Sequence, residues 1–291
     1  MDEGKGYIAL IFSALSFSLM SICVKQLWGR IPVIEMVFFR ALLSLIITLF
    51  LIKLKKLNPW GRNKSLLILR GLLGTLALYC VFRALGKLPI SSATVIQYTY
   101  PTFTALGAWI FLKEKISKRI WLAVFLGWIG ICMVIQPDFG QYLKFKFASL
   151  EILIALLGAI LTSMAYLSVR KLSKTEDELI IVYYFPLVSI ILITPILGMN
   201  YITPSSSDLI WILGIGIFTQ AGQQLITKGL KILSAAKASS VNYIQVIFAS
   251  LWGVIFFEER IDLSTITGGA FVLFATLISI SSSHKEKESL P

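Results

Sequence analysis

Charged residues are scarce in this chain of 291 residues: they make up 14% of it, whereas hydrophobic residues make up 57%. A soluble domain carries about a quarter charged residues, because its surface faces water. The low charge and the mean hydropathy of +0.83 therefore argue against a soluble enzyme and a disordered chain. The three cysteines show no C-x-x-C spacing, which argues against a disulfide scaffold or a zinc site.

Motifs for catalysis are also missing. The chain has no G-x-S-x-G, no H-E-x-x-H and no Walker A loop, and its one histidine, His284, lies in the C-terminal tail. These absences argue against a histidine-based hydrolase and an ATP-driven pump. We expect a protein that is not an enzyme and that needs no metal or cofactor.

Long apolar runs fill most of the chain. A transmembrane helix needs about 20 predominantly apolar residues, and ten segments meet or approach that length. We therefore predict an all-α membrane protein with ten transmembrane helices and short connections. The segments are approximately 6–27, 33–53, 66–86, 92–112, 119–137, 150–170, 180–198, 208–230, 236–257 and 264–283.

The position of the basic residues orients these spans. The net charge is +12, which in a soluble protein would suggest nucleic-acid binding. With the N-terminus placed in the cytoplasm, 18 Lys and Arg residues fall on the inner side and 7 on the outer side, leaving out Arg40 and Arg70 within the spans. This bias follows the positive-inside rule. We predict a plasma (cell inner) membrane protein with both termini cytoplasmic and with no nucleic-acid partner.

The two halves of the chain resemble each other at an offset of 145 residues. Segment 83–116 aligns with 228–261 and pairs Tyr98 with Tyr243 and Glu114 with Glu259. The same offset aligns the first span with the sixth. Each half holds five spans, an odd number, so the halves have opposite orientations in the membrane. Inverted repeats are typical of secondary transporters, whose substrate site lies near the midplane between the halves.

This repeat predicts the domain organisation. We expect a first five-helix repeat over 1–137, a connecting loop over 138–149 and a second repeat over 150–284. A cytoplasmic tail is expected over 285–291. No residue pattern indicates an oligomeric state.

Two stretches carry a resemblance to a known family. Residues 91–117 (SSATVIQYTYPTFTALGAWIFLKEKIS), and the span ends LKEKIS (112–117) and FEERID (257–262), are similar to the EamA family of the drug/metabolite transporter superfamily. The resemblance implies a ten-helix fold built of two repeats. It also implies export of amino acids, related metabolites or drugs, although relatives exchange nucleotide sugars or take metabolites up.

Arg40 is the clearest functional candidate, because an ionisable residue deep in a span is costly unless it has a role. It could line a cavity and meet a carboxylate or phosphate, or it could pair internally with Glu35 or Glu259. Gln220, Gln223 and Gln224 share one face of the eighth span. They are predicted to line the cavity, with bonding between helices as the alternative.

Further substrate-binding candidates lie in the third, fourth and ninth spans. Tyr98 and Tyr243 are related by the repeat and could form a symmetric aromatic lining, although packing is the usual role of such residues. The others are Tyr79, Gln97, Asn242 and Trp252.

A second group of residues is assigned to gating or structure. Pro101 can kink the fourth span, since proline removes a backbone hydrogen bond. Arg83 and Lys228 are related by the repeat and lie near span ends, where they either extend to the interface or contribute to gates. Glu114 and Glu259 end the fourth and ninth spans, at structural turns or at gates.

No carboxylate falls at the middle of any span. Antiport of cationic drugs against protons is therefore disfavoured. We predict a secondary transporter that exports a small polar metabolite, an amino acid or an amino-acid-like compound, by alternating access through the lipid bilayer. The alternatives are an exchanger of nucleotide sugars or other anionic metabolites, and a non-transporting membrane protein for assembly or lipid handling.

Overall fold

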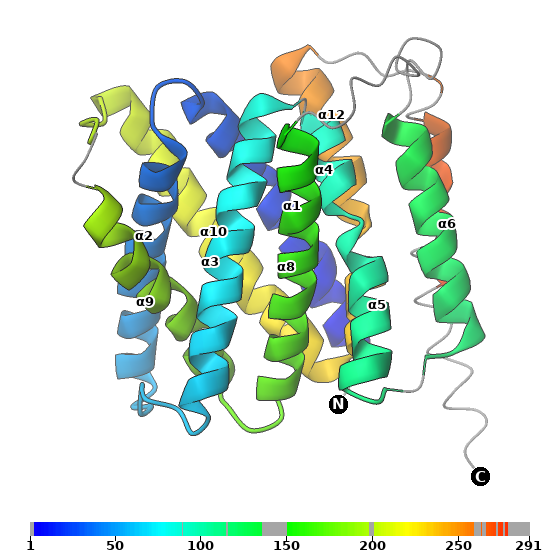
Figure 1. Ribbon diagram of the computed structural model, residues 1–291, viewed down its shortest axis with the longest axis horizontal. Coiled ribbons are helices and arrows are strands. Elements are labelled where there is room, and N and C mark those ends of the chain that lie inside the picture. The colour runs from blue at the N-terminus through cyan, green and yellow to red at the C-terminus, as the bar shows by residue number, and fades with distance from the viewer. Residues whose placement is uncertain are drawn as a thin grey trace.

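The computed structural model of the chain describes residues 3–88, 90–114, 116–135, 150–197, 201–258, 263, 266–271, 273–275 and 277–278. The described residues form a bundle of helices with no strand among them (Figure 1). The helices are α1 (Glu3–Leu27), α2 (Val33–Leu54), α3 (Lys64–Lys87), α4 (Ile90–Gln97), α5 (Tyr100–Phe111), α6 (Lys118–Ile135), α8 (Leu150–Leu172), α9 (Glu178–Leu197), α10 (Ser206–Ile232), α11 (Ala235–Val241) and α12 (Ile244–Phe257).

Seven stretches of the described chain are long and apolar enough to cross a membrane: α1, α2, α3, α8, α9, α10, and α11 with α12 taken together. The number is lower than the ten expected from the sequence, for two reasons. The expected fourth span is divided into α4 and α5, each too short alone. The expected fifth and tenth spans, 119–137 and 264–283, extend into residues that the structure does not describe.

The sequence repeat is also a structural repeat. An offset of 145 residues relates α1 to α8, α2 to α9, α3 to α10, α4 to α11 and α5 to α12. The two most extensive helix interfaces, α1 with α10 and α3 with α8, exchange under this relation. The repeats are inverted, since α1 begins at the end of the bundle where α8 finishes (Figure 1). We call this the inner end, because the charge pattern predicts it to be cytoplasmic, and the opposite one the outer end.

Both repeats break a helix at the same place. The first break falls at Tyr98 and Thr99 and the second at Asn242 and Tyr243. Tight i→i−3 bonds replace helical ones there, such as Thr99 N–H to the Ile96 carbonyl at 3.1 Å. Pro101 occupies the first turn of α5, where its missing N–H costs little. Position 246 in the second repeat is a valine, so the break does not require proline.

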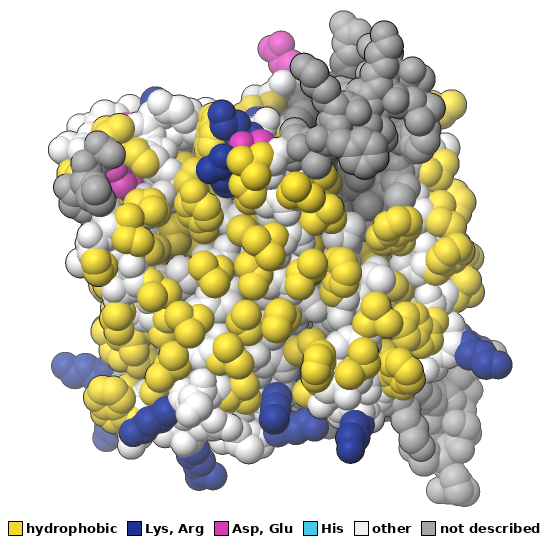
Figure 2. Space-filling model, in the orientation of Figure 1, with side chains coloured by type: hydrophobic (Ala, Val, Ile, Leu, Met, Phe, Trp, Pro, Cys, Tyr) yellow, Lys and Arg dark blue, Asp and Glu magenta, His cyan; other side chains and the backbone are white. Residues whose placement is uncertain are grey.

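The sides of the bundle are apolar. Leu76 on α3 is 53% exposed and Leu157 on α8 is 50% exposed. Figure 2 shows hydrophobic side chains across the middle of this face, with Lys and Arg gathered along its inner edge. A soluble protein would rarely expose so much apolar surface, whereas a lipid-facing surface requires it.

Prediction from helix packing. A Cβ at Gly127 on α6 would lie 2.5 Å from a ring carbon of the fully buried Tyr243, which cannot easily move. Gly127→Ala should therefore destabilise the fold by about 1–3 kcal/mol, as overpacking does. Thermal unfolding of the purified protein in detergent measures the effect. Gly269→Ala is the control, because nothing lies within 4 Å of its added Cβ; equal melting temperatures for the two variants would contradict the packing described here.

Candidate functional site

Two arginines are buried at the centre of the bundle. Arg40 on α2 and Arg70 on α3 are 1% and 2% exposed. Their guanidinium carbons lie 4.5 and 4.4 Å from the centroid of the Phe185 ring on α9. One aromatic ring thus makes a cation–π contact with each of two positively charged side chains.

The hydrogen bonds of these arginines are incomplete. Arg70 Nη2 donates to Gln223 Oε1 at 2.9 Å. The Nε and Nη1 groups of both arginines are buried, and no described residue accepts a hydrogen bond from them. Glu35 is not the partner of Arg40, because its Oε1 accepts from the Ile202 N–H at 2.9 Å. Buried donors without acceptors are costly. Their presence here indicates that a ligand binds at these arginines and later leaves.

The arginines line a central cavity of about 110 Å³. At about 30 Å³ for each water molecule, that volume holds roughly four of them. Side chains from α1, α2, α3, α4, α5, α8, α9, α10 and α12 form its wall, and none of the described lining residues is acidic. The cavity therefore has room for a small molecule and a positive electrostatic character.

The repeat relation runs through the cavity wall. Six pairs of lining residues are 145 positions apart, so the cavity lies on the axis that relates the two repeats. The two residues of each pair differ, so the backbone around the cavity is symmetric while its side chains are not. The pairs are Phe17 with Thr162, Met20 with Ala165, Ser21 with Tyr166, Arg40 with Phe185, Leu78 with Gln223, and Tyr100 with Gln245.

Tyrosines cover one side of the cavity. The Tyr98 ring lies 5.2 Å from the Tyr100 ring, which lies 5.3 Å from the Tyr166 ring, both edge-to-face. The Tyr98 hydroxyl donates to Gln245 Oε1. Behind them, Tyr243 packs with its ring 6.3 Å from that of Tyr98. The helix breaks hold this cluster in place, since Tyr98 and Tyr243 lie at the breaks themselves.

Four of the predicted substrate-binding residues line the cavity together: Arg40, Gln97, Tyr98 and Gln223. Gln97 Nε2 donates to Thr162 Oγ1 at 2.8 Å, while its buried Oε1 has no partner among the described residues. The structure thus joins residues from α2, the α4–α5 break and α10 in one site.

The other candidates lie elsewhere. Gln220 joins α10 to α2 by bonding to Ser44 and to Thr48, the latter at 2.8 Å. Trp252 Nε1 donates to Ser18 Oγ at 2.9 Å and so joins α12 to α1. These contacts correspond to the alternative of bonding between helices. The remaining four do not line the cavity: Asn242 and Tyr243 are buried, Gln224 is half-buried and Tyr79 is 36% exposed.

Sequence reasoning did not select Arg70, Tyr100 or Phe185. Arg70 carries the same signal as Arg40, a charge inside an apolar run, but it lies closer to the start of its span. Phe185 has no signal of its own in so apolar a sequence. Its position 145 residues after Arg40 is the clue, since residues related by the repeat meet near the axis.

The residues assigned to gates lie at the two ends of the bundle. At the outer end, Arg83 forms two bonds with the Glu151 carboxylate, of 3.0 and 3.1 Å. At the inner end, Glu114 accepts from Arg170 Nε at 2.9 Å and from the Ala235 N–H at 3.1 Å. Lys228 is exposed. Pro101 is the exception, because it lies in the first turn of α5, next to the helix break, and not at an end of the bundle. Glu259 lies outside the described residues.

The cavity extends closer to the outer end of the bundle than to the inner end. On α3 its lining runs from Arg70 to Leu85, whereas α10, the repeat-related helix, contributes Gln223. A second hydrophobic cluster, the outer one, packs the other end of the bundle, with Leu27, Ile31 and Ile212 among its members. Six of its buried residues also line the cavity: Met20, Leu78, Ala84, Leu85, Ala93 and Phe185.

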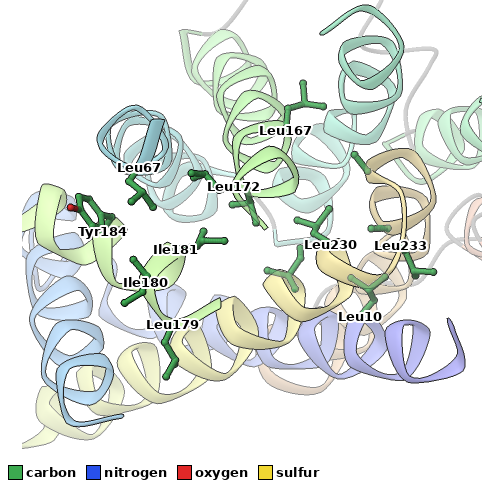
Figure 3. Close-up of a cluster of buried hydrophobic side chains, with 14 of the residues drawn as sticks. Leu10, Leu67, Leu167, Leu172, Leu179, Ile180, Ile181, Tyr184, Leu230 and Leu233 are labelled. Carbon is green, nitrogen blue, oxygen red and sulfur yellow. The ribbon is translucent and has the colours of Figure 1, made fainter. Parts of the chain in front are cut away.

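The inner hydrophobic cluster, by contrast, fills the bundle. It packs the beginnings of α1, α3 and α9 against the ends of α2, α8 and α10, with Leu10, Leu67, Leu172 and Leu230 among its members (Figure 3). None of its buried residues lines the cavity. The cavity is therefore closed toward the inner end by packed apolar side chains.

Apolar helices in two inverted repeats, with a cavity at their interface that buries two arginines, are the architecture of a membrane transporter. The chain belongs to the EamA-like transporter family, which matches it over residues 4–136 and 149–281. The two matched segments correspond to the two structural repeats. The protein is thus an integral membrane protein of a transporter family.

Curated relatives match over nearly the whole chain. It is 26% identical over 274 residues to the pseudopaline exporter CntI of Pseudomonas aeruginosa, covering 94% of each chain. It is 29% identical to human solute carrier family 35 member G1, covering 94% of this chain and 78% of that one. It is 26% identical to the S-adenosylmethionine uptake transporter of Rickettsia prowazekii, covering 98% and 95%. A solved crystal structure shares the fold, with a TM-score of 0.76, 14% identity and 96% coverage of both chains.

Prediction from the cavity lining. In a variant whose three cysteines are replaced by alanine, Thr94→Cys should react with a small membrane-impermeant thiol reagent, because Thr94 lines the cavity. Thr48→Cys is the matched control, since Thr48 is equally a buried threonine but lies between α2 and α10. Mass spectrometry of the labelled protein in sealed vesicles measures the reaction. Labelling of neither position from either side, or equal labelling of both, would contradict the cavity.

Proposed function

We propose that the protein is a secondary transporter that exports a small polar metabolite, an amino acid or an amino-acid-like compound, by alternating access. The observation that carries this proposal is the cavity on the repeat axis, with unpaired arginine donors in its wall. A cavity between inverted repeats can open to either side as one repeat rocks against the other. The export direction rests on the family resemblance alone. The named relatives include both an exporter and an uptake transporter.

The proposal includes the topology expected from the sequence. Ten helices cross the plasma membrane, with repeats over 1–137 and 150–284 joined by a loop over 138–149. Both termini and the tail over 285–291 lie in the cytoplasm. Support comes from the basic side chains at the inner edge of the bundle (Figure 2), which fit the positive-inside rule.

In this topology the structure represents a state in which the cavity faces the outer side. The inner hydrophobic cluster is then the closed inner gate, and the Glu114–Arg170 pair fastens it. Arg170 Nη1 also donates to the Leu230 carbonyl at 2.9 Å, so this pair ties the ends of α5 and α8 to the turn between α10 and α11. At the outer end, Arg83 and Glu151 join α3 to α8 beside the cavity mouth.

The second buried arginine bears on the rival proposal of nucleotide-sugar exchange, because such substrates need several cations. The cavity volume of about 110 Å³ opposes it. Roughly four water molecules fill that volume, and a nucleotide sugar is several times larger. Small metabolites with anionic groups remain the better match.

Prediction for transport. Thr94→Trp should fill the cavity and abolish uptake of metabolites into proteoliposomes, while Leu106→Trp, at a position 38% exposed on α5, should leave uptake unchanged. A broad metabolite mixture, offered with and without a pH gradient and analysed by mass spectrometry, identifies substrate and coupling together. Size-exclusion profiles in detergent check that both variants are folded. The proposal fails if wild-type protein moves no metabolite, or if Thr94→Trp moves as much as wild type.

Prediction for the inner gate. Glu114→Gln removes the carboxylate that holds Arg170 and the Ala235 N–H, so the inner gate should open more often. A reporter cysteine at Leu230, inside the inner cluster, should then react several-fold faster with an impermeant reagent on the cytoplasmic side. Glu178→Gln is the control, because it breaks an ion pair with Lys231 that is more exposed. An unchanged rate in Glu114→Gln would show that the pair does not hold the gate.

A further inference from the structure

The two buried arginines set a charge requirement on whatever enters the cavity. Arginine stays protonated in proteins, so Arg40 and Arg70 bring two positive charges into the membrane interior. Four of their nitrogens, Nε and Nη1 of each, have no acceptor among the described residues. An uncompensated buried charge is strongly destabilising, and here there are two that repel each other.

The surrounding protein compensates these charges only in part. The Phe185 ring contacts both guanidinium groups, and Gln223 accepts one hydrogen bond. A ring face and an amide are weak partners beside a carboxylate, which accepts shorter and stronger charge-assisted bonds. The described lining offers no acid, so the missing negative charge must come from the ligand.

A ligand with one carboxylate would leave one arginine uncompensated. We propose, on the basis of the transport function proposed above, that the substrate is a small molecule with two carboxylate groups, one for each arginine. Both guanidinium carbons lie within 4.5 Å of the same ring centroid, so their separation is at most the sum of those two distances. A short carbon chain spans such a gap.

The rest of the lining suits an amino group on that chain. Gln97 Oε1 is buried and accepts no hydrogen bond from the described residues, so it can accept one from a substrate N–H. Tyr100 and Tyr166 also line the cavity, and aromatic rings attract cations.

The test compares each diacid with its own monoamide, which has the same shape and one charge less. Succinate, glutarate and glutamate are titrated against the purified full-length protein at constant ionic strength, beside succinamate, glutaramate and glutamine, and the thermal shift gives apparent affinities. At least one diacid should bind about 10- to 100-fold tighter than its monoamide, the value of a charged hydrogen-bonded pair.

Arginine variants then assign the charge to the site. In Arg40→Gln and in Arg70→Gln, the preference for the diacid should fall to about one, while binding of the monoamide changes little. Arg62→Gln is the matched control, because Arg62 is exposed in the loop before α3. Melting temperatures without ligand verify folding; if a variant does not fold, the ratio measured on wild-type protein decides alone.

The proposal is overturned if no diacid binds better than its monoamide, or if inorganic phosphate or a phosphate monoester is the anion bound at the arginines. Its failure is distinguishable from failure of the transport function. A protein that moves a neutral or singly charged metabolite in proteoliposomes, without a diacid preference, would refute the two-carboxylate substrate and leave transport standing. A protein that moves nothing would refute both.

Discussion

The packing of α1 against α10, and of α3 against α8, is the interaction on which the rest of this structure depends. Each interface joins a helix of one repeat to a helix of the other, and the repeat relation exchanges the two interfaces. Because both contacts cross between repeats, the axis passes between them. The cavity forms on that axis, and in the proposed alternating-access cycle small changes at the two interfaces open one end and close the other.

The two repeats have matching backbones but unlike side chains in the cavity wall. The matching breaks at Tyr98 and Tyr243 give both halves the same discontinuous helix, which allows related motions. The cavity wall pairs unlike residues, and Arg40 opposite Phe185 is the clearest case. A symmetric positive site would need a second arginine in place of Phe185. Arg70 supplies the second charge from a helix whose counterpart, α10, has isoleucine at the related position, Ile215.

Much of the fold could be predicted from the sequence, because apolar length and the 145-residue repeat are properties of whole segments. The division of the fourth span was foreseen only as a kink at Pro101; the break arises at Tyr98 and Thr99 and recurs without proline. Ten spans stay a prediction, since two of them run into residues outside the described chain.

The site could be predicted in part. Arg40 was identifiable because a charge deep in an apolar span requires a reason. Gln220 and Gln223 have the same residue type and share a helix face, yet Gln220 bonds to Ser44 and Thr48 while Gln223 reaches Arg70. The difference between the two glutamines depends on which helix packs beside each of them, and a single sequence does not show helix neighbours.

The central claim is that the two repeats move against each other about the cavity, and distances across the two ends test it most directly. Spin labels at Lys64 and Lys228 span the inner end, and labels at Lys87 and Leu209 span the outer end; all four residues are exposed. Pulsed electron paramagnetic resonance in liposomes should give two distances for each pair. Conditions that populate the longer inner distance should also populate the shorter outer distance. Single, unchanged distances at both ends under conditions that support transport would contradict the account.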